Sequence, residues 1–258
     1  ILPRCKGGVF SAPDFPSAFT NSVTAIPSKA YWYFPMATDI VFANDVAFGA
    51  GSLLGVGAFG TPGGVQNSNE QPYTRPIGRK QRAEFLGNVS MESNSWIIVN
   101  SSRSATKDGL TETSECVFRG DLVQDGNILA YGQGEECVIP IAGDWTLQAD
   151  ARVYPICDVY AGTGVRFDVG GTFATLEGSQ VLASGRGYGS TNASNVAASI
   201  APGRPINDKN GGGAYGGTNG IAKAGSSEAP GRLYGNAFLP FRGGSCGRYG
   251  SYAQNPGG

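Results

Sequence analysis

Short apolar runs recur along most of the chain and are separated by turn-forming residues. The clearest runs are rich in β-branched and aromatic residues, and Gly, Asp, Asn or Pro stands between most of them. They occupy residues 96–99, 116–118, 127–129, 137–141, 145–147, 153–156, 165–169 and 173–176. Such runs predict β-strands, and their intervals of about 8–12 residues are typical of a sandwich, a barrel or a solenoid. Only residues 84–91 and 194–200 have the pattern of a helix, and both would be short.

A repeat distinguishes among these β-architectures. Residues 125–134 (DGNILAYGQG) align without a gap on residues 178–187 (GSQVLASGRG), and a shorter copy stands at residues 46–51 (VAFGAG). Small residues in register allow one coil of a solenoid to approach the next closely, and the unequal intervals between copies indicate insertions. The pattern therefore predicts an all-β fold of irregular parallel β-helix or β-solenoid-like layers, with very little helix.

Three segments of the chain differ in composition. Residues 1–115 are predicted to form a β-rich N-terminal part or cap, and residues 116–189 a β-solenoid-like core. Residues 190–258 are rich in glycine but carry recurring Tyr and Phe, which favours an ordered segment of extended, polyproline-II-like strands over a disordered linker. Within it, residues 229–247 are expected to fold back on the β-layer. We expect the chain to continue beyond Gly258.

Charge is sparse along the whole sequence. Charged residues make up 15% of the 258 residues, against about a quarter in an average protein, and the formal net charge is −1. A surface of Ser, Thr, Asn, Gln and Gly is typical of extracellular β-proteins and assemblies. A charge near zero does not attract nucleic acid or anionic membranes and offers little resistance to self-association. No apolar run reaches the about 18 residues of a membrane span.

The residue types available for catalysis are limited. The sequence has no histidine, which excludes histidine-based acid–base catalysis, Ser-His-Asp triads and most zinc sites. Its carboxylates form no compact acidic motif, and Arg166 and Asp168, spaced i and i+2, are expected to face one side of a strand. The carboxylates considered are Asp144, Asp150, Asp158, Asp168 and Glu177. We therefore predict no catalytic residue and no cofactor. Structural calcium held by Asp121, Asp125 and Asn127 remains an alternative.

Cysteines and glycosylation sequons favour a secreted or cell-surface protein. The five cysteines lack C-x-x-C spacing, and their wide dispersal predicts disulfides whose pairing stays open, with one thiol left free or bonded to another molecule. The alternative is that they are reduced structural cysteines in the core of a cytosolic protein. They are Cys5, Cys116, Cys137, Cys157 and Cys246. N-glycosylation is predicted at the sequons that begin at Asn88, Asn100 and Asn192.

The densest aromatic cluster lies near the N-terminus. Tyr31, Trp32 and Tyr33 stand consecutively there. Exposed, they would offer a stacking platform for sugars or a contact for a neighbouring subunit; buried, they would fill the core of an end cap.

Two segments carry a family resemblance. Residues 165–189 (VRFDVGGTFATLEGSQVLASGRGYG) and 230–247 (PGRLYGNAFLPFRGGSCG) resemble large glycine-rich surface proteins of bacteria, algae and protists. In those proteins a strand, a turn and the pattern I-x-A-x-G-x-G-Y repeat in a β-solenoid. The resemblance extends over about residues 120–258 and implies a role at the cell surface or in an extracellular matrix. The cysteines and sequons depart from the simplest bacterial members and favour a eukaryotic protein.

These observations lead to one main hypothesis and two alternatives. The main hypothesis is a structural, self-assembling module of an extracellular filament, sheath or matrix, whose partner is itself or another module of a longer chain. The first alternative is a carbohydrate-binding adhesin that uses Tyr31, Trp32 and Tyr33. The second is a polysaccharide lyase or hydrolase of the β-helix type.

Overall fold

The structure is a computed structural model that describes most of the first 183 residues. The described ranges are 18–33, 38–59, 75–76, 81–100, 104–105, 111–112, 114–132, 136–157 and 164–183. These residues contain strands and turns but no helix, so the predicted all-β class is confirmed for them. Because no helix is present there, the described part also has none that could cross a membrane.

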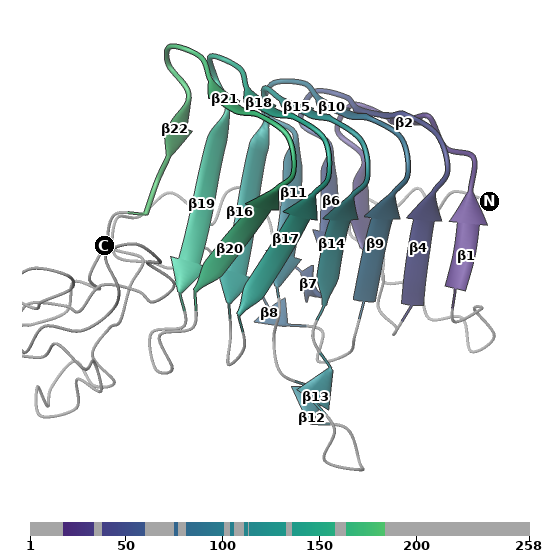
Figure 1. Ribbon diagram of the computed structural model, residues 1–258. Helices are drawn as coiled ribbons and strands as arrows, with labels where there is room; N and C mark the ends of the chain where they lie inside the picture. The colour runs from purple at the N-terminus through teal and green to yellow at the C-terminus, as the bar shows by residue number, and fades with distance from the viewer. Residues whose placement is uncertain are drawn as a thin grey trace, which may run out of the picture. The chain divides into compact units, whose positions relative to one another are not determined.

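Most strands belong to three parallel sheets of six strands each (Figure 1). Sheet A contains β1 (Ala18–Asn21), β4 (Thr38–Phe42), β9 (Gln81–Phe85), β14 (Glu115–Phe118), β17 (Cys137–Ile141) and β20 (Val165–Val169). Sheet B contains β2 (Ala25–Ile26), β5 (Val46–Phe48), β10 (Val89–Met91), β15 (Leu122–Gln124), β18 (Trp145–Leu147) and β21 (Phe173–Thr175). Sheet C contains β3 (Tyr31–Tyr33), β6 (Leu53–Val56), β11 (Trp96–Asn100), β16 (Asn127–Gly132), β19 (Arg152–Cys157) and β22 (Gln180–Val181).

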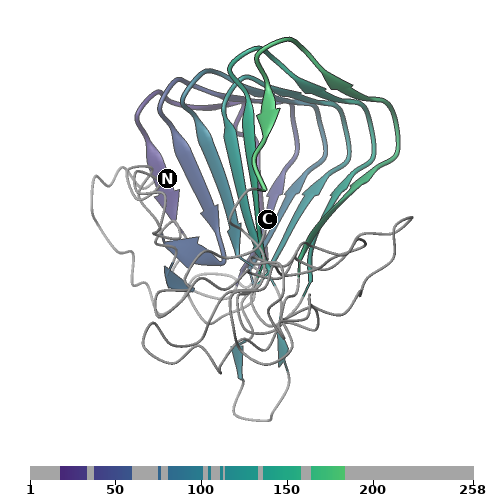
Figure 2. The same ribbon diagram turned by 90° about the vertical axis from the view of Figure 1, so that its left-hand side faces the viewer.

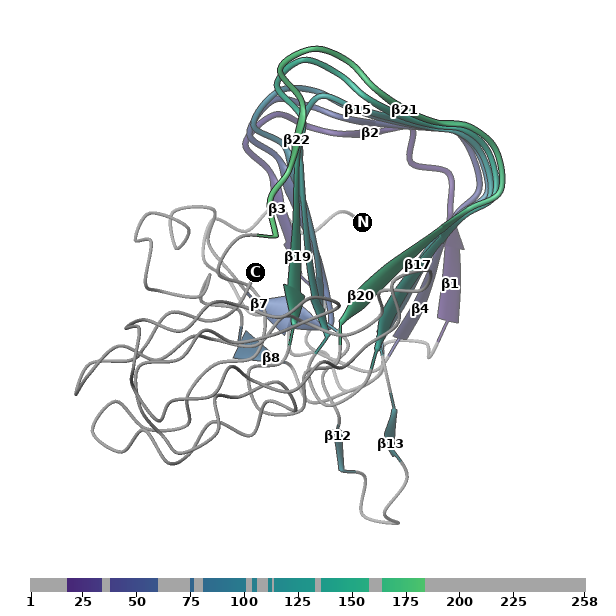
Figure 3. The same cartoon turned by 60° about the vertical axis from the view of Figure 1, so that its left-hand side comes forward.

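The chain visits the three sheets in a fixed order. Three consecutive strands of sheets A, B and C form what we call a triplet, and triplets 1 to 6 begin at β1, β4, β9, β14, β17 and β20. Each strand pairs in parallel with its counterpart in the next triplet, as Ala47 of β5 does with Ser90 of β10. Figures 2 and 3 show these strands stacked in register, with sheet B forming one side and sheets A and C the other two.

The connections between sheets differ in length. Every connection from sheet A to sheet B has three residues, and every connection from B to C has four, except for residues 125–126 in triplet 4. Insertions occur only where the chain passes from sheet C to the next strand of sheet A. These connections are as short as residues 34–37 and as long as residues 57–80. Two of them each contain an antiparallel pair of strands: β7 (Ala58–Phe59) pairs with β8 (Arg75–Pro76), and β12 (Ser104–Ala105) pairs with β13 (Thr111–Glu112).

The core lies between the three sheets. Side chains alternate along the short strands, so that in β5 and β10 the first and third residues are buried and the middle one is exposed. A column of phenylalanines runs through the core from triplet to triplet. The rings of Phe42 and Phe85 are 4.5 Å apart and those of Phe85 and Phe118 are 5.1 Å apart, with interplanar angles of 8° and 6°.

The structure confirms each of the eight strands predicted from residue 96 onward. The helix predicted at residues 84–91 is wrong, because β9 and β10 occupy this stretch and their alternating burial follows a period of two. The predicted boundary at residues 115/116 falls inside the sheets, where Cys116 of β14 pairs with Ala83 of β9. Residues 190–258, including the 229–247 segment and the helix predicted at 194–200, lie outside the described residues.

By its internal contacts the chain divides into two compact units. The first consists of Ile1–Tyr131, Cys137–Tyr154 and Arg166–Leu182 and contains nearly all of the described strands. The surfaces described below belong to this unit.

Candidate interaction surfaces

A short motif marks the connection from sheet A to sheet B in triplets 2 to 5. An aspartate or asparagine stands immediately before the buried residue that opens the sheet B strand, and in three cases a glycine precedes it. The motif reads Asn44-Asp45-Val46, Gly87-Asn88-Val89, Gly120-Asp121-Leu122 and Gly143-Asp144-Trp145. Register pairing places these segments above one another in triplets 2 to 5.

The acidic and amide side chains of this motif form a ladder of hydrogen bonds along the stack. Each Oδ1 accepts a hydrogen bond from the backbone N–H of the corresponding residue in the next triplet. Asp45 accepts from Asn88 at 2.7 Å, Asn88 from Asp121 at 2.9 Å, and Asp121 from Asp144 at 2.9 Å. The ladder ends at Thr172, whose N–H donates to Asp144 at 2.7 Å. It fixes the register at this corner, because each side chain satisfies a backbone group of its neighbour.

A shallow groove lies beside this ladder on the outer face of sheet B. Its volume is about 790 Å³, and its lining comes from triplets 1 to 4. Its lining includes Ala47 and Ser90 from the strands of sheet B, and the polar residues Thr24, Asn44 and Asp45 from the connections between sheets A and B. The volume is within the range of about 300–1,000 Å³ that is usual for ligand sites.

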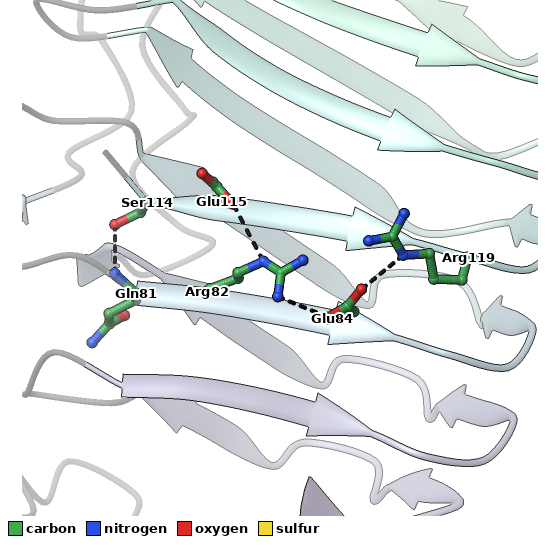
Figure 4. Close-up of polar contacts among 6 residues, drawn as sticks. All are labelled: Gln81, Arg82, Glu84, Ser114, Glu115 and Arg119. Carbon is green, nitrogen blue, oxygen red and sulfur yellow. Dashed lines mark hydrogen bonds and ion pairs between the residues drawn. The ribbon is translucent and has the colours of Figure 1, made fainter. Parts of the chain in front are cut away.

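A network of ion pairs covers part of the outer face of sheet A (Figure 4). Arg82 of β9 contacts Glu84 on its own strand at 2.8 Å and Glu115 on β14 at 3.3 Å. Glu84 also accepts a hydrogen bond from Nε of Arg119 at 2.7 Å. The four charges alternate in sign and tie triplet 3 to triplet 4. The Glu84 side chain is only 12% exposed, which makes it the best shielded member.

Burial and ionic contacts act on the Glu84 carboxyl in opposite directions. Partial burial raises its pKa, but the hydrogen bond from Arg119 and the positive charges of Arg82 and Arg119 outweigh burial and hold the pKa below its ordinary value. A depressed pKa means that ionised Glu84 stabilises the fold above its unfolded-state pKa of about 4.3, and that this stabilisation is lost as the pH falls through the folded-state pKa.

We therefore expect Glu84→Gln to lower the free energy of unfolding by about 1 kcal/mol at pH 7, with the difference from the wild type disappearing below the folded-state pKa. Chemical denaturation at pH 7 and in steps below pH 4 measures this difference. Glu115→Gln is the matched control, because its side chain is 43% exposed and should matter less. A constant difference across the pH range would contradict this account of the network.

A second polar cluster lies at the corner between sheets C and A, where the insertions begin and end. The buried side chain of Gln81 accepts a hydrogen bond from the backbone N–H of Gly57 at 2.7 Å, and the backbone N–H of Gln81 donates to the Ser114 hydroxyl at 3.2 Å. These bonds join the ends of two insertions to the first residue of β9, and Figure 4 shows the bond between Gln81 and Ser114. They hold the ends of the two insertions in place, and the parallel pairing of the strands is not interrupted.

The last triplet exposes large apolar side chains, two of which have buried register partners in triplet 5. Phe173 is 46% exposed, whereas its register partner Trp145 is 2% exposed. Val181 is 50% exposed, whereas its partner Val153 is fully buried. Leu176, between them, is 47% exposed. By contrast, the core residues Ile26 and Trp32 of triplet 1 are 0% and 6% exposed, so the open core surface is at the triplet 6 end.

The three consecutive aromatics near the N-terminus form β3. Trp32 points into the core, where its ring centroid lies 6.4 Å from that of Phe42, while Tyr31 and Tyr33 are half-buried. Of the two alternatives for this cluster, core filling therefore holds for Trp32, because alternation along the strand directs the indole inward and leaves it covered.

The described cysteines lie in the core. Cys116 of β14 and Cys137 of β17 are buried thiols, not half-cystines. Burial, with a smaller contribution from Cys137, raises the pKa of Cys116 and disfavours its reactive thiolate. Disulfides at Cys5, Cys157 and Cys246 stay predictions, since their side chains lie outside the described part.

The predicted glycosylation sites differ in accessibility. Asn88 is exposed in the ladder, whereas Asn100 of β11 is 0% exposed, so the folded chain cannot carry a glycan there. The sequence predicts glycosylation at both sequons, because the apolar run 96–99 does not specify whether the side chain of Asn100 faces the core or the solvent. Asn192 lies outside the described residues.

The residues considered for calcium do not converge. Asp121 and Asp125 stand at opposite ends of β15, and Asn127 is nearly buried at the start of β16. Oδ1 of Asp125 accepts a hydrogen bond from the N–H of Asp150 at 3.3 Å. In the described part of the chain, no group of three or more His, Cys, Asp or Glu residues is placed to hold a metal ion.

The carboxylates considered for catalysis are likewise distributed over the surface. Asp144 belongs to the ladder, Asp150 and Glu177 lie at the corner between sheets B and C, and Asp158 falls outside the described residues. Arg166 and Asp168 face one side of β20 as predicted, with Nε 2.9 Å from Oδ1.

Comparison with known proteins gives no relative. No family model, no curated protein and no solved structure matches this chain.

Proposed function

We propose that the six triplets are the coils of an irregular β-solenoid, and that the chain is a self-assembling structural module of an extracellular filament, sheath or cell-surface matrix. The parallel stacking of three sheets and the confinement of insertions to one corner support the solenoid. The sparse charge of the sequence and its sequons support an extracellular setting.

One observation carries the assembly proposal. The strands β20, β21 and β22 end their sheets, and the core side chains of this last triplet are half exposed. An edge strand presents unpaired backbone groups that template a further strand. Adding a coil from another module would bury Phe173 and Val181, as their register partners Trp145 and Val153 are buried within the stack. We therefore infer that this end is the assembly surface.

The proposal is tested with two valines of similar exposure. Val181 is 50% exposed on the terminal strand β22, and Val123 is 41% exposed on the outer face of sheet B in the middle of the stack. A charge at the assembly surface should abolish association, because burying it unpaired is costly. We expect Val181→Asp to weaken self-association by at least tenfold, and Val123→Asp to leave it unchanged.

Sedimentation velocity over a concentration series measures both variants against the wild type. Far-ultraviolet circular dichroism establishes that each variant retains its strands. A wild-type protein that stays monomeric at the highest concentration removes the support for assembly. If both variants weaken self-association equally, the contact between modules does not lie at the triplet 6 end.

A further inference from the structure

The hydrogen-bond ladder contains one residue of a different kind. Its side-chain acceptors are aspartates at Asp45, Asp121 and Asp144, but an asparagine at Asn88. Asn88 is exposed, and Ser90, two residues later, is exposed on the outer face of sheet B. We propose that Asn88 carries an N-linked glycan and that the first sugars of this glycan occupy the groove over sheet B. The inference rests on the secretory route that the proposed function implies.

Glycosylation of Asn88 is compatible with the ladder. The bond that holds the stack uses Oδ1, which accepts from the N–H of Asp121 at 2.9 Å. No hydrogen bond within the described residues engages Nδ2 of Asn88. The sugar is attached to Nδ2, so the carbonyl oxygen remains an acceptor after modification.

The reaction needs a donor from the secretory pathway, which is a lipid-linked diphosphate oligosaccharide. Nδ2 of Asn88 forms a bond to the anomeric carbon of the first N-acetylglucosamine. The bond between that carbon and the diphosphate oxygen breaks, and the lipid diphosphate leaves with the electron pair. Nδ2 loses one proton to the transferase, and no oxidation or reduction takes place.

The groove has the chemistry that a sugar residue needs. Asn88 itself belongs to its lining, together with the small side chains of Ala47 and Ser90 and the polar groups of Asn44 and Asp45. A sugar ring presents an apolar face to small side chains and hydroxyl groups to polar ones. Covalent attachment at the groove makes the contact intramolecular, so that weak interactions are sufficient to hold the first sugars there.

The second described sequon supplies a contrast within the same chain. Asn100 is fully buried at the end of β11, and a glycan there is incompatible with the fold. The folded, secreted protein is therefore expected to carry sugar at Asn88 and none at Asn100.

Site occupancy is measured by glycopeptide mass spectrometry on the full chain secreted from eukaryotic cells. Ser90→Ala removes the Asn88 sequon without touching the ladder, and Ala25 and Ala47 at register-equivalent positions indicate that alanine is accepted on this face. Ser102→Ala removes the Asn100 sequon in the same way. We expect the glycan to disappear with Ser90→Ala and to be unaffected by Ser102→Ala. An unmodified Asn88, or a glycan on Asn100 in the folded protein, would overturn the proposal.

Occupation of the groove is measured by methyl NMR before and after treatment with a peptide N-glycosidase. The enzyme removes the glycan and leaves the change Asn88→Asp, which the ladder accommodates because three of its members are aspartates. We expect the methyl signals of Val123, which lines the groove, to shift, and those of Val181, in the terminal triplet, to stay in place. Unchanged Val123 signals would overturn the groove contact. Glycan occupancy and self-association are separate readouts, so failure of this inference is distinguishable from failure of the proposed function.

Discussion

Replacing Phe85 with alanine should lower the free energy of unfolding by about 3–5 kcal/mol. Phe85 is fully buried in the middle of the aromatic column, with Phe42 at 4.5 Å on one side and Phe118 at 5.1 Å on the other. Truncation removes both stacked contacts and leaves a cavity between two neighbours that are themselves fixed by the register of sheet A.

Chemical denaturation followed by circular dichroism measures this loss. Phe173→Ala is the matched control: Phe173 also contacts an aromatic ring, Trp145 at 4.8 Å, but it is 46% exposed and leaves no enclosed cavity. We expect the control to cost less than half as much as Phe85→Ala. Equal losses would mean that the phenylalanine column is not the centre of the core.

Gly120→Ala should destabilise the fold by about 1–3 kcal/mol, although it adds only one methyl group. A Cβ at this position would lie 2.6 Å from Oδ1 of Asn88 and 2.8 Å from the backbone carbonyl of Gly87. The side chain of Asn88 is held by its ladder bond, and the backbone of Gly87 belongs to the preceding triplet. Neither can move without disturbing the stacking at this corner.

A second glycine supplies the control for this prediction. Gly51 has a φ of +69°, but only Lys29 lies near its missing Cβ, at 3.6 Å. The corresponding turns of triplets 1 and 3 have Lys29 and Asn94 at positive φ. Gly51→Asn should therefore change the free energy of unfolding by less than about 0.5 kcal/mol. A milder effect for Gly120→Ala than for Gly51→Asn would contradict close approach as the role of Gly120.

The sequence predicted strands well where they are long or strongly apolar. Strands such as β17 and β20 have five residues, and their composition alone identifies them. The three residues of β10 contain too little alternation to define a period, so the sequence pattern of residues 84–91 predicts a helix there instead. The constant three-residue connections and the motif of glycine, Asp or Asn, and an apolar residue supply the missing signal, because they recur in triplets 3 to 5 at 87–89, 120–122 and 143–145.

The structure agrees with the alignment of residues 125–134 on residues 178–187, but not with the third copy of the repeat at residues 46–51. Asn127 and Gln180 occupy the first position of β16 and β22 in sheet C, as their alignment requires. Residues 46–51 are not structurally equivalent to the other copies. Val46–Phe48 belongs to sheet B, whereas the counterpart of β16 in triplet 2 is β6 of sheet C. Apolar residues followed by glycine occur in both sheets, so composition alone does not specify the sheet.

The charged and polar surfaces were beyond prediction from the sequence. Glu84 and Arg119 are 35 residues apart, and Asp45 and Asn88 are 43 residues apart. Insertions of unequal length separate the triplets, so no fixed period connects these partners. The register, which only the structure supplies, is what brings them together.

Fibre diffraction from concentrated native protein, combined with electron microscopy, tests the central claim of end-on assembly most directly. If coils of successive modules stack at the triplet 6 end, the protein forms elongated assemblies, and the strand spacing of about 4.8 Å lies along their long axis. Isolated particles at every concentration, or assemblies in which the 4.8 Å spacing runs across the long axis, would contradict the account.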